Sequence, residues 1–152
     1  MTFLATLLIG IVAGSRSMMA PAAVAWAARL GWIDLAPTWA SFMGSFWAVL
    51  VFSILALGEL VTDQLPTTPS RKVPVQFGAR LVSGALCGAA ICAPAGMLAG
   101  GLVAGVVGAI VGTLGGAKAR SGIAAAFGRD LPAALLEDAV AVAGALLIVT
   151  SL

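Results

Sequence analysis

Long apolar runs separated by short polar stretches make up most of this chain of 152 residues. A membrane-spanning helix needs about 20 apolar residues, because each residue adds about 1.5 Å toward the roughly 30 Å of hydrocarbon in a bilayer. Five runs come near that length and predict an all-α membrane protein with five Gly/Ala-rich transmembrane helices. The first run begins near Thr2, and the others cover about Thr38–Leu60, Phe77–Ala93, Ala95–Gly116 and Leu131–Thr150.

Two polar stretches interrupt the apolar pattern within a single predicted domain, residues 1–152. Residues 61–76 contain "DQLPTTPSRKVP", whose three prolines predict an aqueous loop. Residues 117–131 predict a second loop or a re-entrant segment. Asp130 precedes the last apolar run and is the residue type that caps a helix N-terminus, so we expect it to be the N-cap of the last helix.

Composition supports a bilayer environment. The chain is 61% hydrophobic and 9% charged, with a mean hydropathy of +1.12, whereas soluble domains carry about 25% charged residues. The lipid bilayer is therefore the expected partner, and no nucleic acid is expected. Histidine and tyrosine are absent, which removes the commonest general base and metal ligand. We expect no catalytic residue, cofactor or metal. The enzymatic alternative would be a lipid-modifying enzyme that uses Glu59 and Asp63 on a metal.

Basic residues predict the orientation, because cytoplasmic loops carry an excess of Lys and Arg. Six of the eight basic residues flank the two polar stretches. This places both loops and the N-terminus in the cytoplasm and the C-terminus outside, in the inner (plasma) membrane of a cell. The six are Arg71, Lys72, Arg80, Lys118, Arg120 and Arg129.

Glycines recur every three or four residues along three of the apolar runs. Such small-xxx-small faces let helix backbones approach closely in lipid. The spacing predicts helix contact without telling contact within one chain from contact between chains. Since five short helices offer little internal surface, we expect a homo-oligomer. The glycines are Gly10 and Gly14, Gly84 and Gly88, and Gly101, Gly105, Gly108, Gly112 and Gly116.

Arg16 lies within the first apolar run, in "GSRSMMAPAA". A charge at mid-membrane costs at least ~2.5–3.5 kcal/mol unless it faces protein or water. Gly14 can end one helix, Ser17 can cap the next, and Pro21 fits a first helical turn. The first helix is therefore predicted to break between Gly14 and Ser17, with a second half-helix over about Met18–Ala28.

The predicted break has the chemistry of an anion site. A helix N-terminus carries free N–H groups and about half a positive charge, to which Arg16, Ser15 and Ser17 add a cation and two hydroxyls. The alternative is that Arg16 reaches the outer headgroups or pairs with an acid. "RSMMA" recurs as "RSGIA" from Arg120, which suggests an inverted repeat with Arg120 as the counterpart on the opposite side of the membrane.

Acidic residues inside the predicted helices provide the other candidate groups. Intramembrane acids pair with a base or bind a cation or proton. Two interpretations stay open: buried ion pairs that lock helices together, or carboxylates that gate or couple ion movement. The acids are Glu59, Asp63, Glu137 and Asp138, and the cations within their predicted reach are Arg80, Lys118 and Arg120.

Four short motifs, "GSRS", "GELVTDQLP", "GARLVSGAL" and "LLEDAVAV", resemble those of domain of unknown function 4126, a family of small bacterial integral membrane proteins. The resemblance covers most of the chain and implies a membrane protein fold, but it implies no reaction. By it, the marked positions would be Gly14, Arg16, Glu59, Asp63, Pro66, Arg80, Glu137 and Asp138.

Together these features favour a small transporter or channel for a small, anionic solute. Arg16, Ser15, Ser17 and Arg120 would contact the solute, and the carboxylates would gate or couple. The alternative is a non-transporting membrane scaffold or lipid-binding protein whose buried ion pairs are structural.

Overall fold

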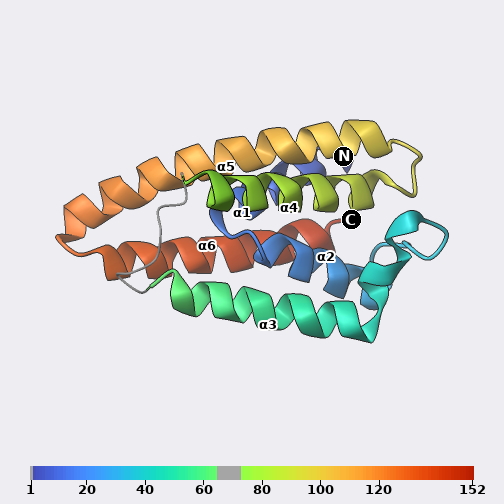
Figure 1. Cartoon of the computed structure of the whole chain (residues 1–152), viewed down its shortest axis with the longest axis horizontal. Helices are drawn as coiled ribbons and strands as arrows, with labels where there is room; N and C mark the ends of the chain where they lie inside the picture. The colour runs from blue at the N-terminus through green and yellow to red at the C-terminus, as the bar shows by residue number, and fades with distance from the viewer. Residues whose placement is uncertain (1, 65–72) are drawn as a thin grey trace.

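The fold is entirely helical in the residues that the structure describes, which are 2–64 and 73–152 of this computed structural model (Figure 1). Pro66, Ser70, Arg71 and Lys72, which the sequence places in the first loop, lie outside the described residues. The helices are α1 (Thr2–Ser15), α2 (Met19–Arg29), the short 3-10 helix η1 (Trp39–Gly44), α3 (Phe46–Thr62), α4 (Pro74–Cys92), α5 (Leu98–Phe127) and α6 (Asp130–Thr150).

Three of these helices, α4, α5 and α6, are long and apolar enough to cross a membrane. α5 has 30 residues, or about 45 Å at 1.5 Å per residue, which exceeds the hydrocarbon thickness of a bilayer. α1 and α3 are apolar but shorter. The helical class expected from the sequence is confirmed, whereas the number of five transmembrane helices is not.

Several predicted helix boundaries need correction. α5 continues to Phe127 rather than ending near Gly116, so residues 117–127 are helical and not a loop. The Ala-rich segment favours helix, and the helix stops only at Gly128, whose φ of 65° suits a glycine. The predicted span Thr38–Leu60 is divided into η1 and α3 at Ser45, whose side chain accepts a hydrogen bond from the Ala48 N–H.

The first helix is broken as predicted. α1 ends at Ser15 and α2 begins at Met19. The two pieces do not form one interrupted crossing, however, because the chain reverses direction at the break and α2 returns toward the end from which α1 starts (Figure 1). α1 and α2 therefore form a helical pair whose tip lies inside the molecule.

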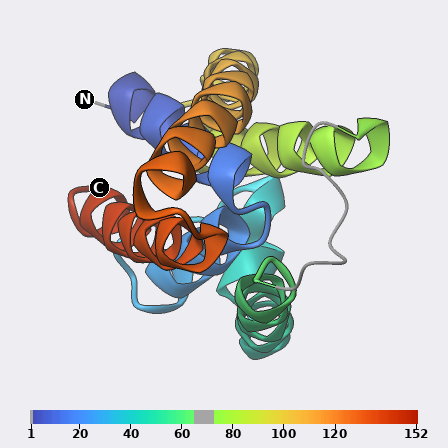
Figure 2. The same cartoon turned by 90° about the vertical axis from the view of Figure 1, so that its left-hand side faces the viewer.

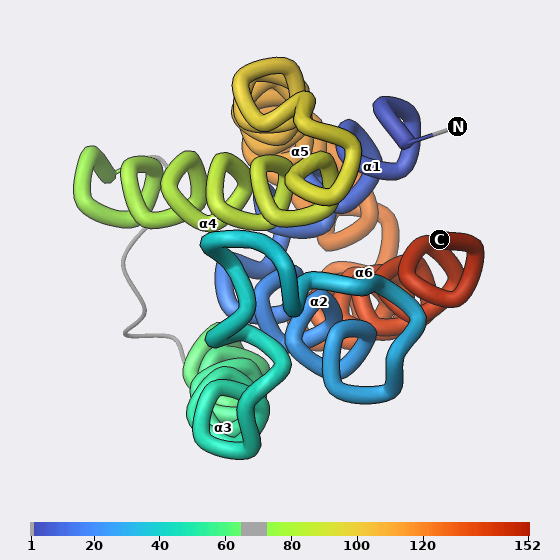
Figure 3. The backbone as a smooth tube through the Cα atoms, turned by 90° about the vertical axis from the view of Figure 1, so that its right-hand side faces the viewer, coloured from blue at the N-terminus to red at the C-terminus, as the bar shows by residue number. Residues whose placement is uncertain are grey.

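The two chain termini lie at the same end of the molecule (Figure 3). One pocket at this end is lined by Thr2, Asp34, Pro94 and Leu152. The turn at Gly128 lies at the opposite end (Figure 1). The sequence predicts the N-terminus on the side of the turn between α5 and α6 and the C-terminus on the other side. The two termini instead share one end of the molecule, because α1 and α2 are separate helices that reverse direction and not a single crossing.

The core is built around α5, which packs against α1 and α4 at very short distance. Glycines make this approach possible. A Cβ built at Gly108 would lie 2.9 Å from the Gly10 Cα, and one built at Gly84 would lie 2.8 Å from the Ala109 Cβ, closer than real side chains approach. The sequence left open whether the glycine faces pack within one chain or between chains. In the structure they pack helices of the same chain together.

α3 lies at the periphery of the bundle (Figure 2). It packs mainly on α2 and η1, and within α3 only Val49 and Ala56 are buried. Trp47, Leu57 and Val61 are each more than 60% exposed. An apolar helix with so little packing surface inside the molecule meets lipid or another chain with most of its circumference.

Candidate functional site

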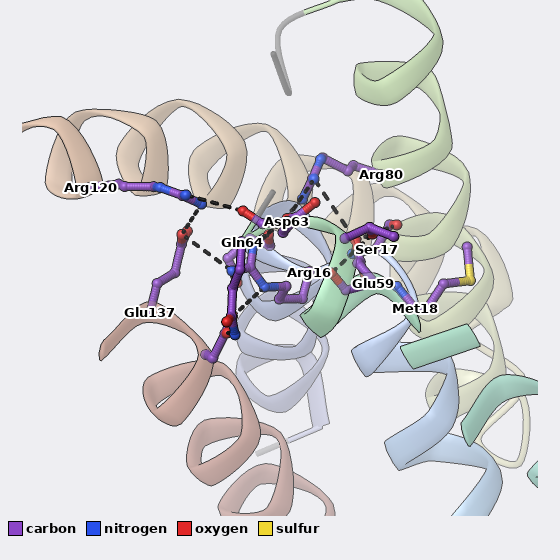
Figure 4. Close-up of polar contacts among 12 residues, drawn as sticks. Arg16, Ser17, Met18, Glu59, Asp63, Gln64, Arg80, Arg120 and Glu137 are labelled. Atoms are coloured by element: carbon purple, nitrogen blue, oxygen red, sulfur yellow. Dashed lines mark hydrogen bonds and ion pairs between the residues drawn. The ribbon is translucent and has the colours of Figure 1, made fainter. Parts of the chain in front are cut away.

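Charged side chains from four helices meet Arg16 at the break between α1 and α2 (Figure 4). With Arg16, they comprise three arginines and four carboxylates, and each of α3, α4, α5 and α6 contributes at least one. We call this set the break network. Its members are Arg16, Glu59, Asp63, Arg80, Arg120, Glu137 and Asp138.

Arg16 is the centre of the break network and has no exposed surface. Its Nε donates to the Asp138 Oδ1 at 2.6 Å, and its Nη1 donates to the Asp63 Oδ2 at 2.5 Å. The Glu137 Oε2 lies 3.8 Å from the Arg16 Nη2. Carboxylates from α6 and from the end of α3 therefore surround the guanidinium. Arg16 pairs with acids, which is one form of the alternative stated above, and it does not extend to the molecular surface.

Glu59 occupies the N-terminus of α2. Its Oε1 accepts hydrogen bonds from the Ser17 N–H at 2.7 Å and the Ser17 hydroxyl at 2.8 Å, and its Oε2 accepts from the Met18 N–H at 2.7 Å. The predicted anion site thus exists as a set of donors, but a carboxylate of the chain itself fills it. Ser17 does not cap α2 as predicted, because its hydroxyl points to Glu59.

Arg80 supplies the complementary group at the C-terminus of α1. Its Nη1 donates to the carbonyl oxygens of Gly14 at 3.0 Å and Ser15 at 2.6 Å. The Thr113 hydroxyl donates to the same Gly14 oxygen at 3.1 Å. A cation therefore faces the negative end of α1, just as the Glu59 anion faces the positive end of α2. The Arg80 Nη2 and the Glu59 Oε1 lie 3.9 Å apart and join the two ends.

Arg120 extends the break network toward the turn between α5 and α6. It donates to Asp130 through Nε at 3.0 Å and through Nη2 at 2.5 Å, and it donates to the Asp63 carbonyl oxygen at 3.2 Å. Asp130 is the first residue of α6, and Arg129 is the N-cap. The predicted N-cap role of Asp130 is therefore wrong, and its carboxylate holds Arg120 instead.

The proposed equivalence of Arg16 and Arg120 does not extend to their local structure. Arg16 lies at a helix break, while Arg120 lies inside the unbroken α5. Both reach the same network, and the Arg120 Nη1 is 3.7 Å from the Glu137 Oε2. The prediction that the two residues lie on opposite sides of a membrane is therefore wrong, and the inverted repeat is not confirmed. Lys118, which the sequence places within reach of the acids, is exposed. Among the residues that the structure describes, Arg16 and Arg120 are the basic residues with a nitrogen within 4.0 Å of the Glu137 carboxylate.

Three polar residues that sequence analysis did not select also contact the break. The Ser83 hydroxyl donates to the Ser17 carbonyl oxygen, Thr113 donates to α1 as described above, and the Gln64 side chain donates to the Asp138 Oδ2 at 3.3 Å. Ser83 and Thr113 are buried and each adjoins a packed glycine. Sequence analysis could have selected both residues, because each is a polar residue next to a glycine of the packing face of an apolar helix.

The break network is chemically an enclosed set of charge-assisted hydrogen bonds. The side chains of Asp63, Glu137 and Asp138 are each 12% exposed. Buried ion pairs are held only when their geometry is good and their remaining bonds are satisfied. The arrangement can therefore lock together the segments that contribute to it.

Comparison with known proteins identifies one family. The family model described as "Domain of unknown function (DUF4126)" matches residues 3–151, which is nearly the whole chain. No curated protein and no solved structure matches the chain significantly.

Proposed function

The chain belongs to the DUF4126 family, and we propose that it is a membrane transporter or channel for a small anionic solute, gated by the break network. The observation that carries this proposal is the occupation of the α2 N-terminus by Glu59 through three hydrogen bonds. These donors form a built anion site, and its present occupant is tethered to a different helix.

The location of the site fits transport. Broken helices whose N-termini point at a substrate anion are a recurring way to bind solutes inside membranes. Non-helical backbone at such depth is tolerated where protein or a water-filled cavity surrounds it. The tip of the α1–α2 pair meets this condition, because Arg80, Thr113 and Ser83 satisfy its carbonyl oxygens.

α3 is the element best placed to act as a gate. Its helix packing is mainly with α2 and η1, and its attachment to the break network depends on Glu59 and Asp63 near its last turn. A solute anion that replaced Glu59 at the α2 N-terminus would release one of these two attachments. Movement of α3 would then uncover Arg16, which supplies the positive charge for the passing anion.

The proposal includes assembly into a homo-oligomer in the inner membrane. The glycine faces no longer argue for assembly, since they pack within the chain. The argument rests on α3, whose apolar side chains Trp47, Leu57 and Val61 are largely exposed. A second copy would cover part of this surface.

The second candidate function is a non-transporting membrane scaffold with structural ion pairs. One observation favours it: Arg16 is completely buried and bonded directly to Asp63 and Asp138. A buried arginine bonded to acids from two other segments suits a permanent lock between the α1–α2 break, the end of α3 and α6.

Efflux from proteoliposomes distinguishes the two candidates. Vesicles containing the protein are loaded with chloride, inorganic phosphate or acetate, and the release of each anion is measured. We expect at least one anion to leave faster than from empty vesicles. Glu59→Ala should increase this efflux because it vacates the anion site, and Arg16→Ala should abolish it because it removes the central cation.

The matched control is Arg29→Ala, because Arg29 is exposed and is the last residue of α2, at the end of that helix away from the break. It should leave efflux unchanged. If neither wild type nor Glu59→Ala releases any of the three anions, while both remain folded by size-exclusion chromatography, the transport proposal is rejected in favour of the scaffold.

A further inference from the structure

A groove of about 350 Å³ lies between α1, α5 and α6, on the side of the break network that Arg120 and Glu137 border. Ligand pockets in proteins span about 300–1,000 Å³ and are mostly apolar with a few convergent polar groups. We propose that this groove binds one acyl chain of an anionic phospholipid, whose phosphate lies beside Arg120.

The body of the groove suits a hydrocarbon chain. Apolar side chains from all three helices line it, among them Ile11, Val111, Leu136 and Val140. Its lining on α5 extends from Val111 to Ile123, a distance of about 18 Å along a helix at 1.5 Å per residue. The groove is therefore long and narrow, which fits an extended chain better than a compact solute.

Glycines on α5 create the space. Gly112, Gly115 and Gly116 line the groove, and they leave no side chains between α1 and α6 along this part of α5. Gly112 is needed for the packing of α1, because a Cβ there would lie 2.9 Å from the Ile11 Cα. A Cβ at Gly115 would meet nothing within 4 Å, so helix packing does not require glycine at this position.

The charges at one end of the groove favour an anionic headgroup. Arg120 and Glu137 line the groove, and Asp130 of α6 bonds Arg120. Lys118 on the last ten residues of α5 and Arg129 in the turn that follows add two further positive charges near this end, so three basic residues face two acids. Lys118 is twenty residues after Leu98, the start of α5, which is about 30 Å or one hydrocarbon thickness. The basic residues therefore reach headgroup level, where basic pockets between membrane helices bind anionic lipids.

This lipid site borders the break network through Arg120 and Glu137, but its groove does not include the α2 N-terminus, so lipid binding can be measured whether or not the protein transports an anion. Lipid bound there would hold α6 against α1 and α5 beside the break network. The lipid site is compatible with both candidate functions, transporter and scaffold.

Native mass spectrometry with added phosphatidylglycerol or phosphatidylcholine tests the site. The informative variant is Gly115→Leu, whose side chain has room to enter the groove, and its control is Gly122→Leu, where a Cβ also meets nothing within 4 Å but which does not line the groove. We expect wild type and Gly122→Leu to retain phosphatidylglycerol in preference to phosphatidylcholine. Gly115→Leu should bind phosphatidylglycerol about tenfold more weakly. Equal retention by Gly115→Leu and wild type overturns the proposal, as does equal binding of the two lipids.

A second measurement needs no variant. Phosphatidylglycerol with a photoactivatable group in its acyl chain is crosslinked to the wild-type protein in vesicles, and the labelled peptides are sequenced. Labelling should concentrate on Ile11, Val111 and Val140. Labelling spread evenly over the exposed apolar residues of α3 and α4 instead would identify ordinary bilayer contact and reject a specific site.

Discussion

At the scale of single residues, Arg80 and Glu59 satisfy the two helix ends at the break, and Arg16 neutralises the acids beside it. The break creates free carbonyl oxygens at the end of α1 and free N–H groups at the start of α2. Glu59 satisfies the N–H groups of Ser17 and Met18, and Arg16 balances Asp63 and Asp138. A buried charge without its partner is strongly unfavourable, so these residues depend on one another.

Arg16→Ala should lower the free energy of unfolding by about 3–5 kcal/mol, because it leaves two buried carboxylates without their main cation. Arg16→Lys should recover part of this loss, since a lysine restores the charge without the planar fork that contacts both acids. Denaturant unfolding in detergent micelles, followed by circular dichroism, measures the change.

Arg29→Ala serves as the control and should leave stability nearly unchanged, because Arg29 is exposed. Equal stability of Arg16→Ala and wild type would mean that the fold does not depend on the pairing of Arg16 with these carboxylates.

At the scale of helices, the packing of α5 decides which other elements can approach. Gly101 and Gly105 lie against Gly88 and Gly84 of α4, and Gly108 lies against Gly10 of α1. In lipid, helices associate through close van der Waals contact rather than through the hydrophobic effect. The two glycine faces of α5 therefore hold α1 and α4 in the positions that bring Arg16 and Arg80 together.

Gly108→Leu should destabilise the protein by about 3 kcal/mol or more, because its side chain would be forced into the α1 backbone at Leu7 and Gly10. The expected outcome is loss of the peak of the folded protein in size-exclusion chromatography and a lower melting temperature. Gly122→Leu, on the same helix with open space at its Cβ, should behave like wild type. Normal folding of Gly108→Leu would show that α1 and α5 are farther apart than the structure places them.

At the scale of the whole molecule, the two ends differ in chemistry. All four tryptophans occur between Trp26 and Trp47, each at least 42% exposed, and Trp32 lines the pocket shared by the two termini. The opposite end carries Arg129 at the turn between α5 and α6. Aromatic residues prefer the membrane interface and basic residues prefer the cytoplasmic side. We therefore expect the termini outside and the Gly128 turn inside.

Cysteine labelling from each side of the membrane tests this orientation. Thr2→Cys and Ser151→Cys should react with an impermeant maleimide added outside, and Arg129→Cys should react only after the membrane is opened. Ser70→Cys should behave like Arg129→Cys, as the basic residues near it predict. Labelling of Thr2→Cys and Ser151→Cys from opposite sides would contradict the fold. If Arg129→Cys and Ser70→Cys react from outside while Thr2→Cys and Ser151→Cys react only after the membrane is opened, the fold stands and only the orientation is contradicted.

The sequence by itself determined the properties that depend on composition and on near neighbours along the chain. Hydrophobic run length identified a helical membrane protein, and Gly14, Ser15 and Ser17 around a charge located the helix break, because helix propensity and the desolvation of Arg16 act locally. The same desolvation argument selected the acids at Glu59, Asp63 and Asp138, since charges in apolar runs need partners.

Only the tertiary structure decided the direction of α2 and the identity of each partner. A break of three residues permits the chain to continue or to reverse, and the choice depends on packing against α3 and α6, which lie far along the sequence. Whether an external anion or Glu59 fills the α2 N-terminus depends on the position of α3, and whether glycines pack within one chain depends on how α1, α4 and α5 converge. These outcomes are set by long-range contacts between helices, which have no signature in local spacing.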